Sequence, residues 1–240
     1  PTSYTLLSKG TSRQVSKVIL QVLTKVDSTM TSVFVKEKPF PPVPEDGKVV
    51  IEMFLEAAKG IPRIIDLLGM QFKPVKSDIN GNITKIQKHY DQNPAEYVTV
   101  NSILEAERQA KVAKDDSSAT TGFLWLKRGL EFMFKLFEEL IKDFQSGAKK
   151  ESTKDCVNAA YEATLIRHHS WMSKKVFGMM SGLSLKRVDM MKHLAFGVEN
   201  KDEQVINEME VYAKTLGQNV AAINTLLLDM GIEEPVKEKK

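Results

Sequence analysis

The stretch Asp78-Ile-Asn-Gly-Asn-Ile-Thr-Lys85 places three polar side chains on one stripe of an α-helix, because Asp78, Asn82 and Lys85 follow the spacing i, i+4 and i+7. The neighbouring stripe is apolar and consists of Ile79, Ile83 and Ile86. The apolar stripe anchors the helix to a core, so the polar stripe lies near the rim of that core. A stripe of this kind is most often a solvated helix face, but its mixture of acceptor, amide and ammonium also suits an uncharged ligand rich in hydroxyl groups.

Two further stretches add an indole ring and an imidazole. In Trp125-Leu-Lys-Arg-Gly-Leu-Glu-Phe132, the residues Trp125, Gly129 and Phe132 share one stripe of another helix. In His169-Ser-Trp171, the His and the Trp would be turned roughly 200° apart on a helix, at about 100° per residue. Together the three stretches provide an acceptor, an amide, a cation, a flat ring and a His, which can form a cradle for a polar headgroup on an apolar body.

Four more segments accompany these stretches in a fixed order. Phe54-Leu-Glu-Ala57 and Ile65-Asp-Leu-Leu-Gly69 precede the first stretch, and Asp91-Gln-Asn-Pro94 and Ile103-Leu-Glu-Ala-Glu107 follow it. With these motifs the chain resembles the glycolipid transfer protein family over roughly residues 40–230. The resemblance implies an all-α fold, a two-layer helical sandwich of about eight helices with an apolar lipid pocket between the layers. It also implies non-enzymatic transfer of glycosphingolipids between membranes, with the sugar headgroup bound at the pocket mouth and the ceramide chains enclosed.

The resemblance assigns headgroup and amide binding to five residues. It implies that Asp78 accepts hydrogen bonds from both the sugar and the ceramide amide, and that Asn82 and Lys85 bind the sugar. It further implies that Trp125 stacks on the sugar and that His169 donates to the amide carbonyl. Taken by itself, a Trp or a His among apolar neighbours is more often part of the core, so these roles rest on the resemblance.

Selectivity between a sugar and a phosphate is expected at Trp125 and Gly129. Family members that carry ceramide phosphate have cationic side chains around this site, since phosphate prefers Arg and Lys. The residues found here therefore favour a neutral sugar, and Arg128 lies on a different helical face by its spacing. Two departures from the family pattern are Glu131, where a basic residue is expected, and the lack of any Tyr after Tyr212 near the C-terminus.

The resemblance also implies an apolar pocket and a membrane-docking site. The predicted pocket lining consists of Ile65, Leu68, Phe72, Val75, Phe132 and Phe177, although apolar core and apolar pocket walls look alike in a sequence. Trp171 is turned off the His169 stripe and suits a membrane interface because its ring is amphipathic. We expect it to dock with Lys174 and Lys175; the alternative is a Trp packed against a neighbouring helix.

Length and composition describe an ordinary globular protein. A chain of 240 residues can form one domain with a sizeable core, and its net charge of +3 favours an anionic membrane surface slightly without indicating nucleic acid. The single Cys156 has no internal disulfide partner, which fits a reducing compartment. We therefore expect a cytoplasmic monomer without cofactors that visits membranes as a peripheral protein.

Helical patterns run along the chain and strand patterns are missing. The patterns predict helices at 48–60, 62–69, 77–91, 94–113, 118–146, 151–178, 184–197 and 202–230, and a further amphipathic helix that carries Val15 to Val26. The Pro-rich stretch Phe40–Gly47 predicts a connector. We expect an N-terminal extension over 1–45, a glycolipid transfer protein-like domain over 46–232 and a charged mobile tail over 233–240.

Three other functions fit parts of this pattern. One is the transfer of ceramide-1-phosphate or another sphingolipid, and another is a lipid sensor that presents residues 1–45 to a partner. The third is an enzyme that uses His169 with Asp78, but the sequence has no Gly-x-Ser-x-Gly nucleophile motif and Cys156 has no obvious base near it in sequence. No spacing of His and carboxylates suits zinc. We therefore expect no catalytic residues and no metal site.

Overall fold

A computed structural model describes residues 32–147 and 150–235 of the protein, apart from the side chains of Trp171, Met172 and Val176. The backbone of the described residues forms helices and no strands, so the all-α prediction is confirmed. The helix predicted to carry Val15 to Val26 lies outside the described residues.

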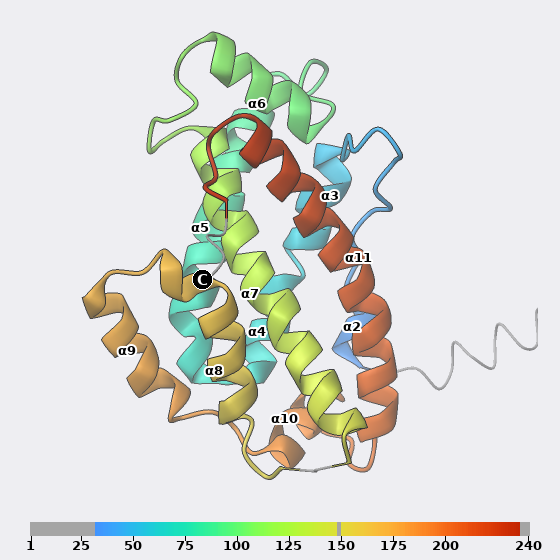
Figure 1. Cartoon of the computed structure of the whole chain (residues 1–240). Coiled ribbons are helices and arrows are strands. Elements are labelled where there is room, and N and C mark those ends of the chain that lie inside the picture. The colour runs from blue at the N-terminus through green and yellow to red at the C-terminus, as the bar shows by residue number, and fades with distance from the viewer. Residues whose placement is uncertain (1–31, 148–149, 236–240) are drawn as a thin grey trace, which may run out of the picture. The chain divides into compact units, whose positions relative to one another are not determined.

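The helices stack in two layers, as the family resemblance implied. In Figure 1, α3, α4 and α5 lie behind α7, while α8 and α11 flank α7 in the front layer. The α-helices are α2 (Val33–Lys36), α3 (Ile51–Ala58), α4 (Ile61–Leu68), α5 (Lys73–Tyr90), α6 (Val100–Gln109), α7 (Ala119–Gln145), α8 (Lys154–Ala163), α9 (Trp171–Ser181), α10 (Arg187–Leu194) and α11 (Asp202–Asp229). Two short 3₁₀ helices, η1 (Met70–Phe72) and η2 (Leu165–Arg167), precede α5 and α9.

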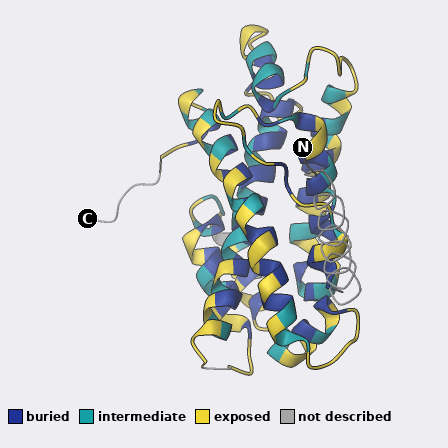
Figure 2. Ribbon diagram, turned by 90° about the vertical axis from the view of Figure 1, so that its right-hand side faces the viewer, coloured by how far each residue is buried: buried dark blue, intermediate teal, exposed yellow. Residues whose placement is uncertain are grey.

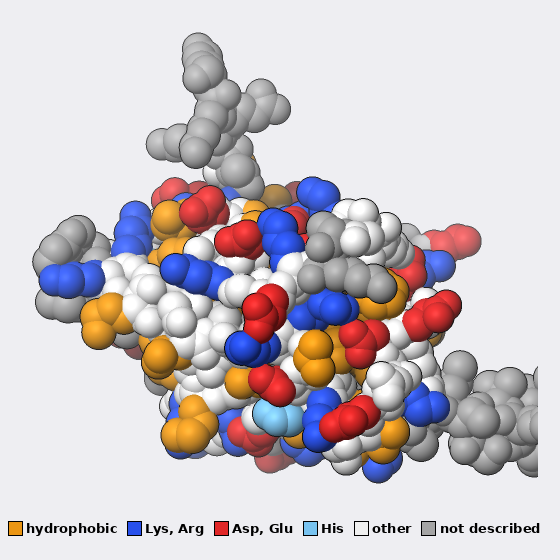
Figure 3. All heavy atoms as spheres, turned by 90° about the horizontal axis from the view of Figure 1, so that it is seen from below, with side chains coloured by type: hydrophobic (Ala, Val, Ile, Leu, Met, Phe, Trp, Pro, Cys, Tyr) orange, Lys and Arg blue, Asp and Glu red, His pale blue; other side chains and the backbone are white. Residues whose placement is uncertain are grey.

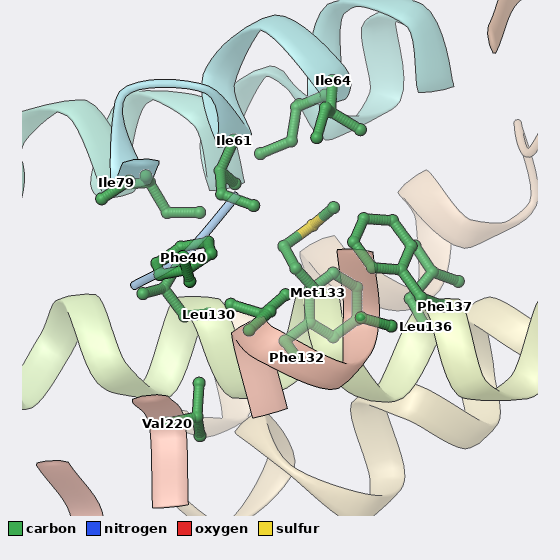
Figure 4. Packing of buried hydrophobic residues seen from close by; sticks show 14 of the residues in the cluster. Phe40, Ile61, Ile64, Ile79, Leu130, Phe132, Met133, Leu136, Phe137 and Val220 are labelled. Carbon is green, nitrogen blue, oxygen red and sulfur yellow. The ribbon is translucent and has the colours of Figure 1, made fainter. Parts of the chain in front are cut away.

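The core lies between the layers, with α7 at its centre. Figure 2 shows the buried faces of the helices turned inward and the exposed faces turned to solvent. Ile61 of α4 and Ile79 of α5 point toward α7, where Leu130 and Met133 meet them (Figure 4), and all four side chains are buried. Such contacts follow from the 3.6-residue apolar period of each helix.

Two glycines allow α5 and α7 to approach closely. A Cβ atom on Gly129 would lie 3.0 Å from Cγ1 of Ile79, and one on Gly122 would lie 3.0 Å from Cγ1 of Ile86. Each pair of positions is seven residues apart on its helix, so the close contact repeats after two turns. Trp125 lies between the two glycines and is therefore held beside the polar stripe of α5.

A buried carboxylate fixes the start of α7. Glu107 of α6 accepts hydrogen bonds from the N–H groups of Ala119 and Thr120 and from the Thr120 hydroxyl, each at 2.7 Å. Nδ1 of His89 on α5 lies 3.3 Å from the same carboxylate. The first N–H groups of a helix lack partners inside the helix, so a carboxylate there satisfies them and complements the helix dipole.

The segment before α3 belongs to the same compact unit as the helices, which begins at Ser32. Phe34 and Phe40 are buried, and their ring centres lie 5.6 and 6.1 Å from that of Tyr212 on α11. The Ser32 N–H donates to Glu208 of α11 at 3.2 Å. Residues 32–45, which we assigned to the extension, therefore contribute apolar side chains to the core.

The single helix predicted over 151–178 is wrong, because the chain leaves the helical conformation after α8. The backbone of Thr164 has φ −126° and ψ −81°, outside the helical region. Its hydroxyl donates to the carbonyl of Ala160 at 2.7 Å, a local bond that competes with the helix. The other predicted helices are present with shifted ends; the one predicted from residue 94 begins at Val100, where Thr99 forms a capping box.

The next helix, α9, begins only at Trp171. Ser170 is extended, with φ −64° and ψ 166°, and its hydroxyl accepts from the N–H of Ser173 at 3.3 Å, as an N-cap residue does. His169 therefore lies in the break between η2 and α9 rather than on a helix. The helical offset from which we inferred the direction of Trp171 does not apply.

Candidate functional site

A pocket of about 330 Å³ opens between α5, α7, η2 and α9. It brings together three of the five predicted headgroup residues, Asp78, Trp125 and His169. Its apolar wall includes Val75 and Phe177, which were predicted, together with Leu165 and Met180, which were not. Polar groups from three separate elements thus converge at the mouth of an apolar recess.

Asp78 lies at the boundary of this pocket with a second hollow on the outer face of α5. The hollow is lined by Pro74, Ser77, Asp78, Gly81, Asn82 and Lys85. The side chain of Asp78 is open to solvent, yet the protein atoms packed around it desolvate the carboxyl and raise its pKa. A hydrogen bond from Asn82 and the charge of Lys85 only partly offset this effect. The carboxylate is therefore short of partners and suited to accept from ligand O–H or N–H groups.

Asn82 and Lys85 form the rest of the predicted polar stripe, but neither lines the main pocket. Asn82 is buried, and its Nδ2 donates to the backbone carbonyl of Asp78 at 2.9 Å. Nζ of Lys85 donates to the carbonyl of Asp116 at 2.5 Å, in the loop before α7. Asn82 and Lys85 line the second hollow together with Asp78. They could therefore contact only the part of a ligand that extends past Asp78 out of the main pocket.

Trp125 is half-buried and interacts with the side chain that follows one turn later. The guanidinium carbon of Arg128 lies over the indole, 4.7 Å from the ring centre. Arg128 does not line the pocket beside Gly129, but its long side chain folds back along the helix and reaches the indole. Arg128 is held there by Glu233, which accepts from its Nη2 at 2.8 Å and from its Nε at 3.0 Å.

His169 is oriented by a residue that sequence reasoning missed. Its Nδ1 lies 3.0 Å from the hydroxyl of Tyr161. Burial, with a smaller contribution from the charge of Lys174, lowers the pKa of His169, so the ring is neutral near pH 7. When Tyr161 donates to Nδ1, Nε2 carries the proton and can donate to a ligand carbonyl. Tyr161 is eight residues before His169 across the helix break, where helical spacing gives no signal.

Aromatic rings lead from the pocket into the core. Phe177 stacks on Tyr161 with ring centres 3.7 Å apart and an interplanar angle of 9°. Phe177 also meets Phe132 edge to face at 6.0 Å, and Phe132 lies 6.5 Å from Phe72. This row of rings links the predicted headgroup residues to the apolar interior.

The predicted apolar lining divides into two groups. Val75 and Phe177 line the pocket itself. The remaining predicted side chains are buried in the core cluster behind it; they are Ile65, Leu68, Phe72 and Phe132. Contact of this second group with lipid chains stays a prediction.

The docking surface was predicted at Trp171, Lys174 and Lys175. The side chain of Trp171 lies outside the described part of the structure, and both lysines are exposed. The surface here also carries exposed apolar side chains that were not predicted, since Met179 and Leu183 are each 70% exposed. Figure 3 shows hydrophobic side chains reaching the surface on the side of the molecule where α9 lies, among charges of both signs.

Other chemistries find little support in residues 32–147 and 150–235. No group of three or more His, Cys, Asp or Glu side chains could hold a metal ion there. Burial raises the pKa of the Cys156 thiol to about 11, so the reactive thiolate is scarce at pH 7. The described helices include none that is long and apolar enough to cross a membrane.

Comparisons with known proteins identify the family of this chain. The family model described as "Glycolipid transfer protein (GLTP)" matches residues 49–196. The chain is 35% identical over 196 residues to a glycolipid transfer protein of Danio rerio, which covers 81% of this chain and 92% of the relative. Its fold is similar to the structure that shows how FAPP2 selects simple glycosphingolipids using the GLTP-fold, with a TM-score of 0.72, 29% identity, and coverage of 86% of this chain and 95% of that one.

A more distant structure shares the fold alone. Human ceramide-1-phosphate transfer protein, solved in complex with 12:0 ceramide-1-phosphate, has a TM-score of 0.70 and 15% identity, covering 80% of this chain and 93% of that one. The family match spans more than half of the present chain, and it includes Asp78, Trp125 and His169. The chain therefore belongs to the glycolipid transfer protein family.

Proposed function

We propose that the protein transfers glycosphingolipids between membranes without changing them chemically. The observation that carries the proposal is the convergence of Asp78, Trp125 and His169 on one pocket that continues into an aromatic core. Neighbours in the same family support it, since one relative is a glycolipid transfer protein and FAPP2 selects simple glycosphingolipids.

The polar residues divide the headgroup between them. Asp78 accepts from the ceramide N–H and from sugar hydroxyls, while Nε2 of His169 donates to the amide carbonyl. Trp125 offers its indole to the apolar face of the sugar, and Asn82 and Lys85 bind hydroxyls further out. This set pairs donors with acceptors for a polyhydroxylated, uncharged headgroup.

The lipid chains supply most of the binding free energy. Apolar surface removed from water contributes about 25 cal/mol per Å², so two long chains provide a large driving force. A pocket of about 330 Å³ is small for such chains. We expect the chains to enter by displacing Phe177 and the helix that carries it, along the row toward Phe132 and Phe72.

Docking brings this pocket mouth to the membrane. We propose that Trp171, Lys174 and Lys175 face the bilayer together with the exposed Met179 and Leu183. Lysines attract anionic lipid headgroups, and apolar side chains insert at the interface. We expect the protein to act as a monomer at the cytoplasmic surface of membranes, where its buried thiol stays reduced.

Transfer of ceramide-1-phosphate is the second candidate. It is favoured by the shared fold of the human ceramide-1-phosphate transfer protein and by Arg128 beside Trp125. Against it, Arg128 is already bound to Glu233, and Gly129 provides no cation. We therefore rank neutral glycolipid first.

A vesicle-to-vesicle transfer assay tests the proposal. Donor vesicles would contain monohexosylceramide, dihexosylceramide, sulfated glycolipid, ceramide phosphate or phosphatidylcholine, one at a time. The neutral glycosylceramides should move fastest. Faster movement of ceramide phosphate in the same vesicles would overturn the headgroup assignment, and steady formation of a new product would indicate an enzyme.

Two aromatic substitutions separate docking from recognition. Trp171→Ala should weaken vesicle adsorption while a soluble short-chain glycolipid still binds. Trp125→Ala should do the reverse and lose headgroup binding first. If Trp171 is instead packed in the protein, its removal should cost about 3–5 kcal/mol of stability, which a thermal melt would detect.

A further inference from the structure

A single carboxylate near the C-terminus binds the two cations beside the pocket. Oε2 of Glu233 accepts from Nζ of Lys127 at 2.7 Å, and the same carboxylate binds Arg128 through two hydrogen bonds of 2.8 and 3.0 Å. Glu233 and Lys127 are buried, and the side chain of Arg128 is only 11% exposed. The ion pairs connect residues more than one hundred positions apart, so they depend on the folded chain.

Only the side chain of Arg128 separates the Glu233 carboxylate from Trp125 at the headgroup site. Arg128 spans the distance, since its guanidinium binds Glu233 and lies over the ring of Trp125 at 4.7 Å. Trp125 in turn lines the pocket. A cation suited to phosphate therefore stands next to the binding site but is already neutralised.

We propose that Glu233 sets the charge selectivity of the pocket by keeping Arg128 from anionic headgroups. An anionic sphingolipid, whose headgroup carries a phosphate or a sulfate, must compete with a buried carboxylate for the guanidinium. A neutral sugar needs no such cation and is unaffected. The inference rests on the proposed function and adds a residue that determines which lipids it accepts.

The chemistry of the pair makes this competition severe. Arg stays protonated at all accessible pH values, and its planar fork matches a carboxylate or a phosphate in the same bidentate manner. Burial of the Glu233 carboxyl raises its pKa, but hydrogen bonds from Arg128 and Lys127 outweigh this and leave the pKa at about 2. The carboxylate is thus ionised under all physiological conditions, and the headgroup has to displace a permanent charge.

The neighbouring Glu131 provides a matched control. Its Oε2 lies 3.3 Å from Nζ of Lys127, so it belongs to the same charge cluster. Among the described residues, its ion pair is with Lys127, whereas the ion pair and hydrogen bonds of Arg128 go to Glu233. Neutralising Glu131 changes the net charge of the cluster by the same amount as neutralising Glu233, without releasing the guanidinium beside Trp125.

The test compares Glu233→Gln, Glu131→Gln and wild type in the vesicle assay, with ceramide phosphate, sulfated glycolipid and monohexosylceramide. The readout is the ratio of anionic to neutral transfer rates. Glu233→Gln should raise this ratio roughly tenfold. The released guanidinium can then donate charge-assisted hydrogen bonds to an anionic headgroup, and such a bond changes binding by about that factor. Glu131→Gln should leave it near the wild-type value. An unchanged ratio in Glu233→Gln, or an equal rise in both variants, would overturn the inference.

Two double variants serve as further controls. One tests whether a change in the ratio comes from an unpaired buried Lys127, and the other tests whether Arg128 is the cation responsible. Glu233→Gln leaves the buried Lys127 poorly paired, whereas Lys127→Met with Glu233→Gln removes both partners and still releases Arg128. This folded double variant should show the same rise in ratio. Adding Arg128→Met to Glu233→Gln should abolish the rise; its persistence would exclude Arg128 as the cation. Wild-type protein that moves no neutral glycolipid would refute the proposed function itself, a result distinct from an unchanged ratio.

Discussion

The two walls of the pocket differ in how firmly they are held. The wall that carries Asp78 and Trp125 is built from α5 and α7, which meet closely at two glycines and bury one face along most of their length. The opposite wall is formed by η2, the break around His169, and α9. Of the described side chains of α9, only Phe177 and Ser181 are buried.

We propose that the two walls have different roles: the α5–α7 wall recognises the lipid headgroup, and the α9 wall lets the lipid chains enter. A headgroup site needs groups fixed to within a fraction of an ångström, which long packed helices provide. Entry of two lipid chains needs a wall that can move, and we infer that α9 is that wall, because only two of its described side chains are buried. We expect selectivity to depend on the α5–α7 wall and transfer rate to depend on the α9 wall.

The largest effect is expected at Asp78. Asp78→Val removes the acceptor that we propose for both the sugar and the amide, and a hydrogen bond to a charged group is worth about 1.5–3 kcal/mol. Transfer should fall more than tenfold while the helical circular dichroism spectrum stays unchanged. Asn80→Val, on an exposed face of the same helix, controls for helix propensity and should transfer normally. A folded Asp78→Val protein with full transfer would refute the assignment.

A pair of glycine substitutions tests the rigidity of the two walls directly. Gly129→Ala places a methyl group 3.0 Å from Cγ1 of Ile79. Overpacking costs about 1–3 kcal/mol, of which the better helix propensity of Ala offsets about 0.5–1 kcal/mol, so we expect a net loss of stability. Gly178→Ala, in α9, meets no atom within 4 Å and should be neutral or stabilising, by about 0.5–1 kcal/mol from helix propensity. Thermal melts should show a lower melting temperature for Gly129→Ala, by about 2–4 °C per kcal/mol, and an equal or higher one for Gly178→Ala. Equal losses in both variants would show that the walls do not differ.

A smaller, severalfold effect is expected at the proposed docking surface on the α9 wall. Replacing both Met179 and Leu183 with Ser should reduce vesicle adsorption severalfold, because about 25 cal/mol per Å² of apolar insertion is lost. Binding of a soluble short-chain glycolipid should not change. Val211→Ser, at a 72% exposed position on α11, is the matched control and should adsorb like wild type. Loss of adsorption in the control would place the docking surface elsewhere.

The smallest effect concerns pH and belongs to the same wall. Burial, assisted by the charge of Arg128, lowers the pKa of His168 to about 4, so the unfolded chain, with a pKa near 6.5, takes up a proton first as the pH falls. This contribution to stability is complete above about pH 6.5 and is lost as the pH falls toward 4. The melting temperature should therefore drop less between pH 7 and pH 5 in His168→Gln than in wild type. Parallel curves would contradict the assignment.

Sequence reasoning was most successful where one helix carries the whole pattern. The stripe of Asp78 and Asn82 and the apolar stripe of Ile79 were predictable, because a continuous helix fixes all their angles. The segment 151–178 was misjudged because apolar residues continue through it at helical intervals. Only the local hydrogen bonds of Thr164 and Ser170 end one helix and start another, and both residue types also occur inside helices.

Contacts between distant segments could not be predicted from spacing. The position of Arg128 over Trp125 depends on a carboxylate that lies 105 residues further along the chain. Glu233 itself appeared to begin a mobile charged tail, since a run of Glu and Lys at a terminus usually is solvated. Glu233 is buried because Lys127 and Arg128 both pair with its carboxylate, and this pairing is visible only in the folded structure.

The carboxylate of Glu107 at the start of α7 has a consequence for how the chain folds. It closes a loop of only twelve to thirteen residues, and loops of about ten residues close within roughly 10–100 ns. Closing so short a loop costs little chain entropy. The Glu107 carboxylate supplies the hydrogen-bond acceptors that the first N–H groups of α7 lack within the helix. We expect the α6–α7 hairpin to be formed in the folding transition state. Glu107→Gln should then slow folding far more than it speeds unfolding, whereas Phe177→Leu on the α9 wall should act mainly on unfolding.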